Sequence, residues 1–307
     1  MGMPVEIRVA HTDPTKASEA ATAAFETISA LNDIYSDYEY DSELSQLSRT
    51  ENRDVPLSPN LWMILKRSLE LAEQSQGAFD PTIGPLTSLW RKARREGSFP
   101  REDYLDRALG SSGYHLLTLN SNKQSARLAT DRMRLDLGGI AKGAAIDAAG
   151  ETLRAHNITR FLILAGGDML AGEAAEGSDG WAVKLPEALG SAPLTNPEDI
   201  QTLSLQNQAL ATSGDLFQYV EIDGVRYSHI IDPESGLGLR IQRIVWVLSP
   251  DATTSDSLAT TLSVLGPSKG KRLVEKHYPS ADFLIVEQRD GVPARYPSNG
   301  WPDSKHF

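Results

Sequence analysis

The sequence of 307 residues contains no cysteine. Without cysteine the chain cannot form a disulfide, bind zinc through thiolates or carry a lipid on a cysteine side chain. The absence of cysteine allows an oxidising compartment but does not point to one.

Long apolar runs are also missing. The longest runs fall far short of the roughly 20 residues that a transmembrane helix needs. The first residues lead straight into a strand-like segment, without the charged and apolar regions of a signal peptide. The sequence therefore predicts no transmembrane segment. For its compartment two interpretations stay open, a cytoplasmic protein or the mature or trimmed form of an exported one.

Positive charge is scarce, since 30 lysine and arginine residues stand against 41 acidic ones and the net charge is −11. This balance argues against nucleic acid as the main partner. An acidic protein that binds a phosphate-rich ligand needs local cations, from lysine, arginine or a metal ion. With 40% hydrophobic residues, the chain is long enough for one large or two medium domains.

Apolar spacing and turn residues indicate helices and strands that alternate irregularly along the chain. Because there is no strict strand–helix–strand repeat, an α+β fold is favoured over a doubly wound sheet. The basic stretch RKARREG (91–97) is interpreted as a solvated helix face. We predict helices over 17–35, from Ser58 to Gly77, and over 140–155, 255–266 and 268–277; strands are predicted over 5–9, 134–137, 160–170, 243–250 and 281–288.

The stretch RLDLGGIAKGAAID (134–147) combines the end of a predicted strand, two glycines and the start of a helix. Gly138 and Gly139 permit a close backbone approach. Free amide groups at a helix start can bind phosphate. The spacing matches neither a P-loop nor a dinucleotide-binding turn. An ordinary strand-to-helix turn therefore stays open as the alternative to a phosphate site.

Asp256 and Thr260 lie four residues apart on a predicted helix, so both project from one face. A carboxylate and a hydroxyl oxygen suit a hard cation such as Mg²⁺. The alternative is that Asp256 complements the helix dipole, as acids in a first turn commonly do.

Other polar residues allow two interpretations each. His229 lies at a strand end and is either a general base or a partly buried histidine with a structural partner. Asp80 either binds a polar ligand group or forms an Asx turn. Tyr38 and Tyr40 either stack on an aromatic ring or cover the edge of a core.

The order of the motifs is more specific than any one of them. The stretches YEYDSELSQLS, GAFDPTIGPL, RLDLGGIAKGAAID, LAGGD, ATSGD, YSHIIDPESG and TTSDSLATTLSVLG together resemble the ApbE family of FAD:protein FMN transferases, over residues 1–288. The resemblance implies an α+β fold of two subdomains with a flavin site between them. Residues 1–307 would then form a single flavin transferase domain.

The resemblance also implies an activity. Members of the family use Mg²⁺ to split FAD and transfer FMN through a phosphoester bond to a threonine of an acceptor protein, with release of AMP. Acceptors in the family include membrane subunits of electron-transfer complexes. The family is usually exported, often with a lipid-anchoring cysteine. Two alternatives stay open: an FAD pyrophosphatase that gives FMN and AMP, and a flavin-binding protein without turnover.

Site residues follow from the resemblance, position by position. His229 matches the histidine that deprotonates the acceptor threonine. The expected FAD contacts are Met1, Tyr38, Ala78, Phe79, Asp80, Asp136, Lys142 and Ile230. The expected metal ligands are Asp256, Thr260 and the backbone carbonyl groups of Gly139 and Ala259.

Overall fold

The computed structural model describes residues 4–50, 52–186, 200–214, 218–289 and 292–302. Met1, an expected FAD contact, lies outside these residues. The chain divides into two compact units, which are described separately. Unit 1 comprises residues 1–30, 142–216 and 243–307, and unit 2 comprises residues 31–141 and 217–242. Helices and antiparallel sheets occur in both units, so the predicted α+β class is confirmed.

A seven-stranded antiparallel sheet forms the centre of unit 1, in the order β1-β5-β6-β9-β12-β13-β14. The strands β1, β5, β12 and β13 confirm the strands predicted over 5–9, 160–170, 243–250 and 281–288. The strand bounds are Val5–Val9 (β1), Phe161–Ala165 (β5), Asp168–Ala171 (β6), Gln208–Gly214 (β9), Arg243–Ser249 (β12), Asp282–Arg289 (β13) and Val292–Pro297 (β14).

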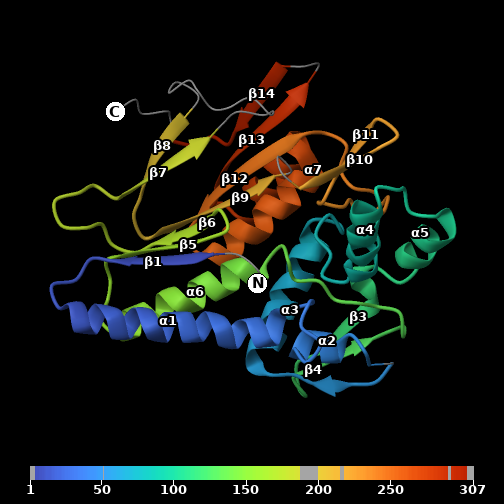
Figure 1. Ribbon diagram of the computed structural model, residues 1–307, viewed down its shortest axis with the longest axis horizontal. Helices are drawn as coiled ribbons and strands as arrows, with labels where there is room; N and C mark the ends of the chain where they lie inside the picture. Colours follow the sequence, from blue (N-terminus) through green and yellow to red (C-terminus); the bar gives the residue numbers. More distant parts are fainter. Residues whose placement is uncertain (1–3, 51, 187–199, 215–217, 290–291, 303–307) are drawn as a thin grey trace. The chain divides into compact units, whose positions relative to one another are not determined.

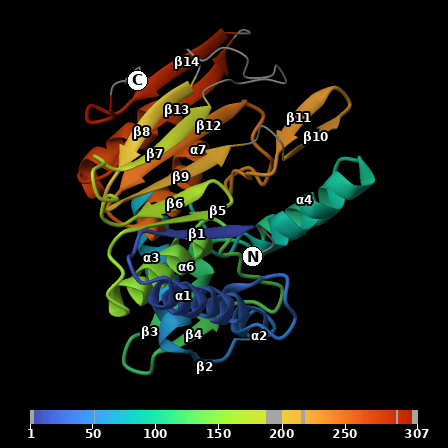
Figure 2. The same cartoon turned by 60° about the vertical axis from the view of Figure 1, so that its left-hand side comes forward.

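Helices cover one face of this sheet and a strand pair covers the other. Figures 1 and 2 both show α1 (Pro14–Tyr35) and α6 (Ala141–Ala155) on one side of β1 and β5, and β7 (Trp181–Pro186) with β8 (Ile200–Leu205) on the other side. Alternate residues of each strand therefore enter different cores. Ala20, Ile146 and Phe161 belong to the helix-side core, whereas Trp246 and Leu203 belong to the opposite one.

Helix α7 (Ala252–His277) packs on β9 and β12 of the same sheet. Asp251 caps its first turn by accepting a hydrogen bond from the amide of Thr254 at 2.9 Å. Gly266, with φ 70° and ψ −178°, and Pro267 interrupt the helical backbone. The helical backbone thus breaks at the point where the sequence predicted one helix to end at Gly266 and the next to begin at 268, and α7 comprises both segments.

Unit 2 combines short helices with two small sheets. The helices are α2 (Glu43–Leu47), α3 (Pro59–Gln74), α4 (Gly84–Glu96), α5 (Glu102–Leu109) and the 3₁₀ turn η1 (Tyr114–Leu116). The strands are β2 (Val55–Pro56), β3 (Leu117–Asn120) and β4 (Ser125–Leu128) in the order β2-β4-β3, with β10 (Tyr219–Ile222) and β11 (Val225–Ser228) as a separate hairpin. As predicted, Ser58 caps α3, accepting from the Leu61 amide at 3.2 Å.

One predicted strand is wrong. Residues 134–137 form only an isolated parallel bridge between Arg134 and Ile83, although the alternating sequence favoured a strand. The Asp136 amide donates instead to the carbonyl of Pro81 at 2.9 Å, and the Asp136 side chain turns back onto the amide of Gly138. The stretch thus lies against the loop that contains Asp80.

Among the residues that the structure describes, no helix has the length and apolar character needed to cross a bilayer.

Candidate functional site

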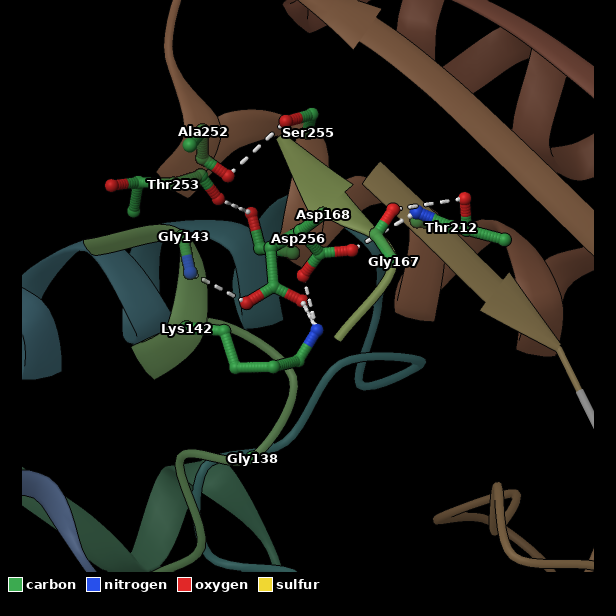
Figure 3. A network of polar contacts seen from close by, with 12 residues as sticks. Gly138, Lys142, Gly143, Gly167, Asp168, Thr212, Ala252, Thr253, Ser255 and Asp256 are labelled. Atoms are coloured by element: carbon green, nitrogen blue, oxygen red, sulfur yellow. Dashed lines mark hydrogen bonds and ion pairs between the residues drawn. The ribbon is translucent and has the colours of Figure 1, made fainter. Parts of the chain in front are cut away.

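Unit 1 brings a lysine and two acids together at the starts of three elements (Figure 3). Lys142 lies in the first turn of α6, Asp168 begins β6, and Asp256 lies in the second turn of α7. The ammonium group of Lys142 forms an ion pair with Asp168 and lies 3.1 Å from Oδ1 of Asp256. Lys142 is therefore not a solvated helix lysine, since only 25% of its side chain is exposed.

Backbone amides fix the two carboxylates. Oδ2 of Asp256 accepts a hydrogen bond from the amide of Gly143 at 2.9 Å. Oδ1 of Asp168 accepts one from the amide of Thr212 at 3.1 Å. Side-chain exposure is 4% for Asp256 and 1% for Asp168. Both carboxylates are thus held in one orientation before any ligand binds.

Burial shapes the ionisation of this cluster. Burial raises the pKa of Asp168 to about 7, against the opposing effect of the Lys142 ammonium group and with a contribution from the Asp256 carboxylate. Burial alone would lower the pKa of Lys142, but the carboxylates of Asp256 and Asp168 outweigh it and raise that pKa. With all three groups ionised, the cluster carries one net negative charge.

Asp147 fixes α6 against α7. Its carboxylate accepts hydrogen bonds from the amides of Ala252 and Thr253, at 2.7 and 2.8 Å, at the start of α7. A side chain at Gly143 would collide with the carbonyl of Ala252, so the two helices touch through backbone here. These contacts set the position of Lys142 relative to Asp256.

The oxygen atoms of α7 that are expected to bind metal differ in whether they already have hydrogen-bond partners. Ser255, Ser257, Thr261 and Ser263 all donate their hydroxyls to backbone carbonyls of α7. The Thr260 hydroxyl has no hydrogen-bond partner in the described part of the chain. The Ala259 carbonyl accepts from Ser263 Oγ at 2.8 Å, so a metal there would compete with this bond.

The oxygen atoms of Asp256 and Thr260 on α7 suit a hard cation only if other groups complete its coordination. Within the described ranges, no group of three or more His, Asp or Glu side chains is arranged to hold a metal ion. Asp256 and Thr260, one helical turn apart, offer one carboxylate and one hydroxyl that has no partner among the described residues. Mg²⁺ commonly takes one or two carboxylates and fills its other positions with water and substrate phosphate. The donor set therefore fits Mg²⁺ only with substrate or carbonyl oxygens in addition. Gly139, the other expected carbonyl ligand, belongs to unit 2, and its metal contact stays a prediction.

Unit 2 contains the remaining expected flavin contacts. Asp80 is buried, and its Oδ1 accepts from the amide and the hydroxyl of Thr82, at 2.7 and 2.6 Å. Burial raises the pKa of Asp80, and the bonds from Thr82 oppose that rise. Asp80 thus forms the Asx turn that the sequence left open, which shapes the loop beside Ala78 and the buried Phe79.

Asp136 and Tyr38 are linked through an arginine of α4. Oδ1 of Asp136 accepts from the Gly138 amide at 2.8 Å, and Oδ2 accepts from Arg91 at 3.3 Å. The Arg91 guanidinium also lies over the ring of Tyr38, which is 73% exposed. The interpretation of 91–97 as a solvated helix face is therefore wrong at Arg91.

His229 follows β11, and its ring orientation is fixed by a backbone group. Nδ1 lies 3.1 Å from the carbonyl oxygen of Gln218. Because a carbonyl only accepts, a neutral ring bonded to it carries its hydrogen on Nδ1 and its lone pair on Nε2. Asp232 is occupied by its own turn, where it accepts from Ser235 Oγ at 2.8 Å. Ile230 is buried next to the histidine.

Sequence reasoning missed three residues of these clusters. Asp168 is the last residue of the quoted motif LAGGD, Asp147 ends the motif RLDLGGIAKGAAID, and Arg91 begins RKARREG. The family motifs singled out the stretches of Asp168 and Asp147, whereas the stretch of Arg91 was interpreted as a solvated helix face. Nothing in the local pattern showed which side chains turn inward.

Solved structures of ApbE proteins share this fold. The structure titled "Flavin Transferase ApbE from Vibrio cholerae" matches with a TM-score of 0.83 and 27% identity, covering 98% of this chain and 95% of that one. The ApbE protein from Thermotoga maritima matches with a TM-score of 0.81 and 26% identity, covering 95% and 96%. The chain therefore has the fold of the ApbE proteins.

Sequence comparison gives the same assignment. The chain is 31% identical over 271 residues to the FAD:protein FMN transferase of Haemophilus influenzae, covering 85% of this chain and 76% of that protein. It is 32% identical over 267 residues to the protein of the same name from Vibrio cholerae, covering 85% and 77%. The sequence model of the ApbE family matches residues 1–285. The chain belongs to the ApbE family, as its motifs predicted.

Proposed function

We propose that this chain is a FAD:protein FMN transferase that depends on Mg²⁺ and modifies a threonine of an acceptor protein. The family match over residues 1–285 is the observation that carries this proposal. Relatives named for this activity, at 31% and 32% identity, support it. The acceptor is an electron-transfer subunit, by the same resemblance.

Asp256 and Thr260 would hold the Mg²⁺ ion, with Gly139 and Ala259 offering carbonyl oxygens. When bound, the ion would neutralise charge on the pyrophosphate of FAD and on the AMP that leaves. The Gly143 amide and the Lys142 ammonium group hold the Asp256 carboxylate in one orientation. This support is already in place in the protein, which reduces the reorganisation that ligand binding would need.

His229 is proposed as the general base. The threonine oxygen of the acceptor forms a bond to the phosphorus of the FMN half. The bond from that phosphorus to the bridging oxygen breaks, and AMP leaves with this oxygen. Nε2 of His229 takes the proton of the threonine hydroxyl, because Nδ1 is engaged with the Gln218 carbonyl.

FAD itself would be held by the contacts expected from the motifs. Tyr38 offers an exposed ring for stacking. The loop of Ala78, Phe79 and Asp80 offers backbone groups, and Met1 and Ile230 complete the apolar contacts. Asp136 and Lys142 are each already paired within their own units, so their proposed role is to orient neighbouring groups as well as to touch the nucleotide.

Purified protein incubated with FAD and Mg²⁺, with and without an acceptor peptide, tests the proposal. AMP release that requires the peptide, together with a peptide heavier by one FMN moiety, is the expected result. AMP release without the peptide, with free FMN as co-product, means an FAD pyrophosphatase instead. FAD binding without any AMP means a flavin-binding protein without turnover.

A peptide with the acceptor threonine replaced by alanine is the matched control. Transfer should stop with this peptide. Continued labelling would contradict the proposed threonine target. Loss of transfer on addition of EDTA, restored by excess Mg²⁺, tests the metal requirement separately.

A further inference from the structure

Arg91, which is not among the site residues implied by the family resemblance, lies at the centre of a side-chain cluster within unit 2. Its Cζ lies 4.1 Å from the centroid of the Tyr38 ring. Nη1 lies 2.5 Å from Asp37 Oδ2, and Nη2 lies 3.3 Å from Asp136 Oδ2. One guanidinium group thus stacks on a proposed flavin contact and bonds to a second one.

The backbone of Tyr38 is fixed independently of its ring. Ser36 Oγ accepts hydrogen bonds from the amides of Tyr38 and Glu39, at 3.3 and 3.2 Å. The carbonyl of Ser36 in turn accepts from the hydroxyls of Ser42 and Ser45, at 2.5 and 3.2 Å. The chain around Tyr38 is therefore a hydrogen-bonded turn from which the ring projects, 73% exposed.

Arg91 is itself held firmly. Its side chain is 24% exposed, and its carboxylate partners Asp37 and Asp136 are 17% and 8% exposed. Burial and the neighbouring Asp136 carboxylate raise the pKa of Asp37, while Arg91 opposes that rise. An arginine bonded to two acids in this way has little rotational freedom. The plane on which the Tyr38 ring rests is therefore rigid.

We infer that Arg91 is a positioning residue for FAD binding, which holds the Tyr38 ring as a ready stacking surface for an aromatic ring of FAD. The inference rests on the proposed function, because the flavin contact of Tyr38 comes from it. One face of the ring rests on the guanidinium group, so the opposite face is the one left for the ligand. A ring that is ordered beforehand loses less conformational entropy when it binds.

A matched control is a second arginine–tyrosine pair, whose tyrosine, Tyr40, is two residues from Tyr38 in the sequence. Arg49 lies over the ring of Tyr40, with Cζ 3.9 Å from its centroid, and Tyr40 is 72% exposed. Arg49 also donates to the carbonyl of Tyr40 at 2.8 Å. This second arginine–tyrosine pair has a similar distance between Cζ and the ring centroid, but Tyr40 is not among the expected flavin contacts.

FAD affinity is measured by quenching of flavin fluorescence, without an acceptor, on the full chain. Arg91→Met is expected to raise Kd about 3- to 10-fold, the range for loss of a partly desolvated cation–π contact. Arg49→Met is expected to leave Kd unchanged. With an acceptor peptide present, kcat at saturating FAD should change little for Arg91→Met, since the loss is in binding.

Two further variants separate stacking from charge and from folding. Arg91→Lys keeps a cation between Asp37 and Asp136 but loses the planar group, so it should fold normally and still raise Kd. In a Tyr38→Ala background, Arg91→Met should have no further effect on Kd, because Arg91 acts through the ring.

Several results would overturn the inference. Unchanged Kd in both Arg91 variants is one, and an equal loss in Arg49→Met is another. An undiminished effect of Arg91→Met in the Tyr38→Ala background would mean that Arg91 acts on FAD directly or through Asp136. If the wild-type protein does not bind FAD at all, the proposed function is overturned instead. The titration of the wild-type protein alone tests this point, independently of the variants.

Discussion

Gly143 donates its backbone amide hydrogen to Oδ2 of Asp256, 2.9 Å away, so the start of α6 is bonded directly to the carboxylate of α7. The bond uses one of the amides that a first helical turn leaves without a partner. Lys142, the preceding residue, approaches the other oxygen of the same carboxylate. A motif in α6 and a motif in α7, more than a hundred residues apart, thus form a single site in unit 1.

Asp256→Asn should abolish most transfer while the protein stays folded. Asparagine keeps an oxygen for the Gly143 amide but loses the charge that attracts Mg²⁺. We expect the rate to fall on the order of 10²- to 10³-fold. Transfer rates over a range of Mg²⁺ concentrations and far-UV circular dichroism check both parts. Near-normal turnover at limiting Mg²⁺ would show that Asp256 is not a metal ligand.

Thr260→Val should raise the Mg²⁺ concentration needed for half-maximal rate by about 10-fold or more, because it removes the unpaired hydroxyl next to Asp256. Thr261→Val is the matched control, since the Thr261 hydroxyl is already bonded to the Ser257 carbonyl at 2.7 Å. The control should change stability by about 1 kcal/mol or less and leave the Mg²⁺ dependence alone. An equal shift in both variants would contradict the role of Thr260.

Lys142→Met should lower the free energy of unfolding by about 3 kcal/mol, because it leaves Asp168 and Asp256 buried without a cation. Lys271→Met, at an exposed lysine of α7 that pairs with Glu275 on the surface of the helix, should cost far less. Urea denaturation measures both.

Adding Asp168→Asn to Lys142→Met tests the cause of that loss. The second change removes one of the two uncompensated charges, so part of the lost stability should return. If the stability lost by the double variant equals the sum of the losses measured for Lys142→Met and Asp168→Asn alone, the two side chains are not energetically coupled.

His229→Ala should slow transfer about 10²- to 10⁴-fold, the usual contribution of a general base, while FAD still binds. His156→Ala, at an exposed position of unit 1, should leave both properties unchanged. Steady-state kinetics and flavin fluorescence distinguish the two effects. Loss of FAD affinity together with rate would make His229 a ligand-positioning residue instead of a base.

The family, the α+β class and most regular elements could be predicted from local sequence patterns. Periodic apolar residues and local signals such as Ser58-Pro59 and Gly266-Pro267 specify helices through short-range interactions. The spacing of Asp256 and Thr260 on one helix is equally local, so the common face of these two residues followed from the sequence. Ordered motifs over the whole chain were sufficient to identify the family.

The contacts between polar side chains, in contrast, could not be predicted without the three-dimensional fold. The stretch 134–137 alternates like a strand, but contacts with the loop at Pro81 and with Gly138 replace the sheet partners that a strand would need. Arg91 belongs to a basic run that resembles a solvated surface, yet it bonds to Asp37 and Asp136. Asp168 pairs with a lysine that is distant in sequence. Pairing and burial depend on chain segments brought together by folding, and a local pattern carries no information about them.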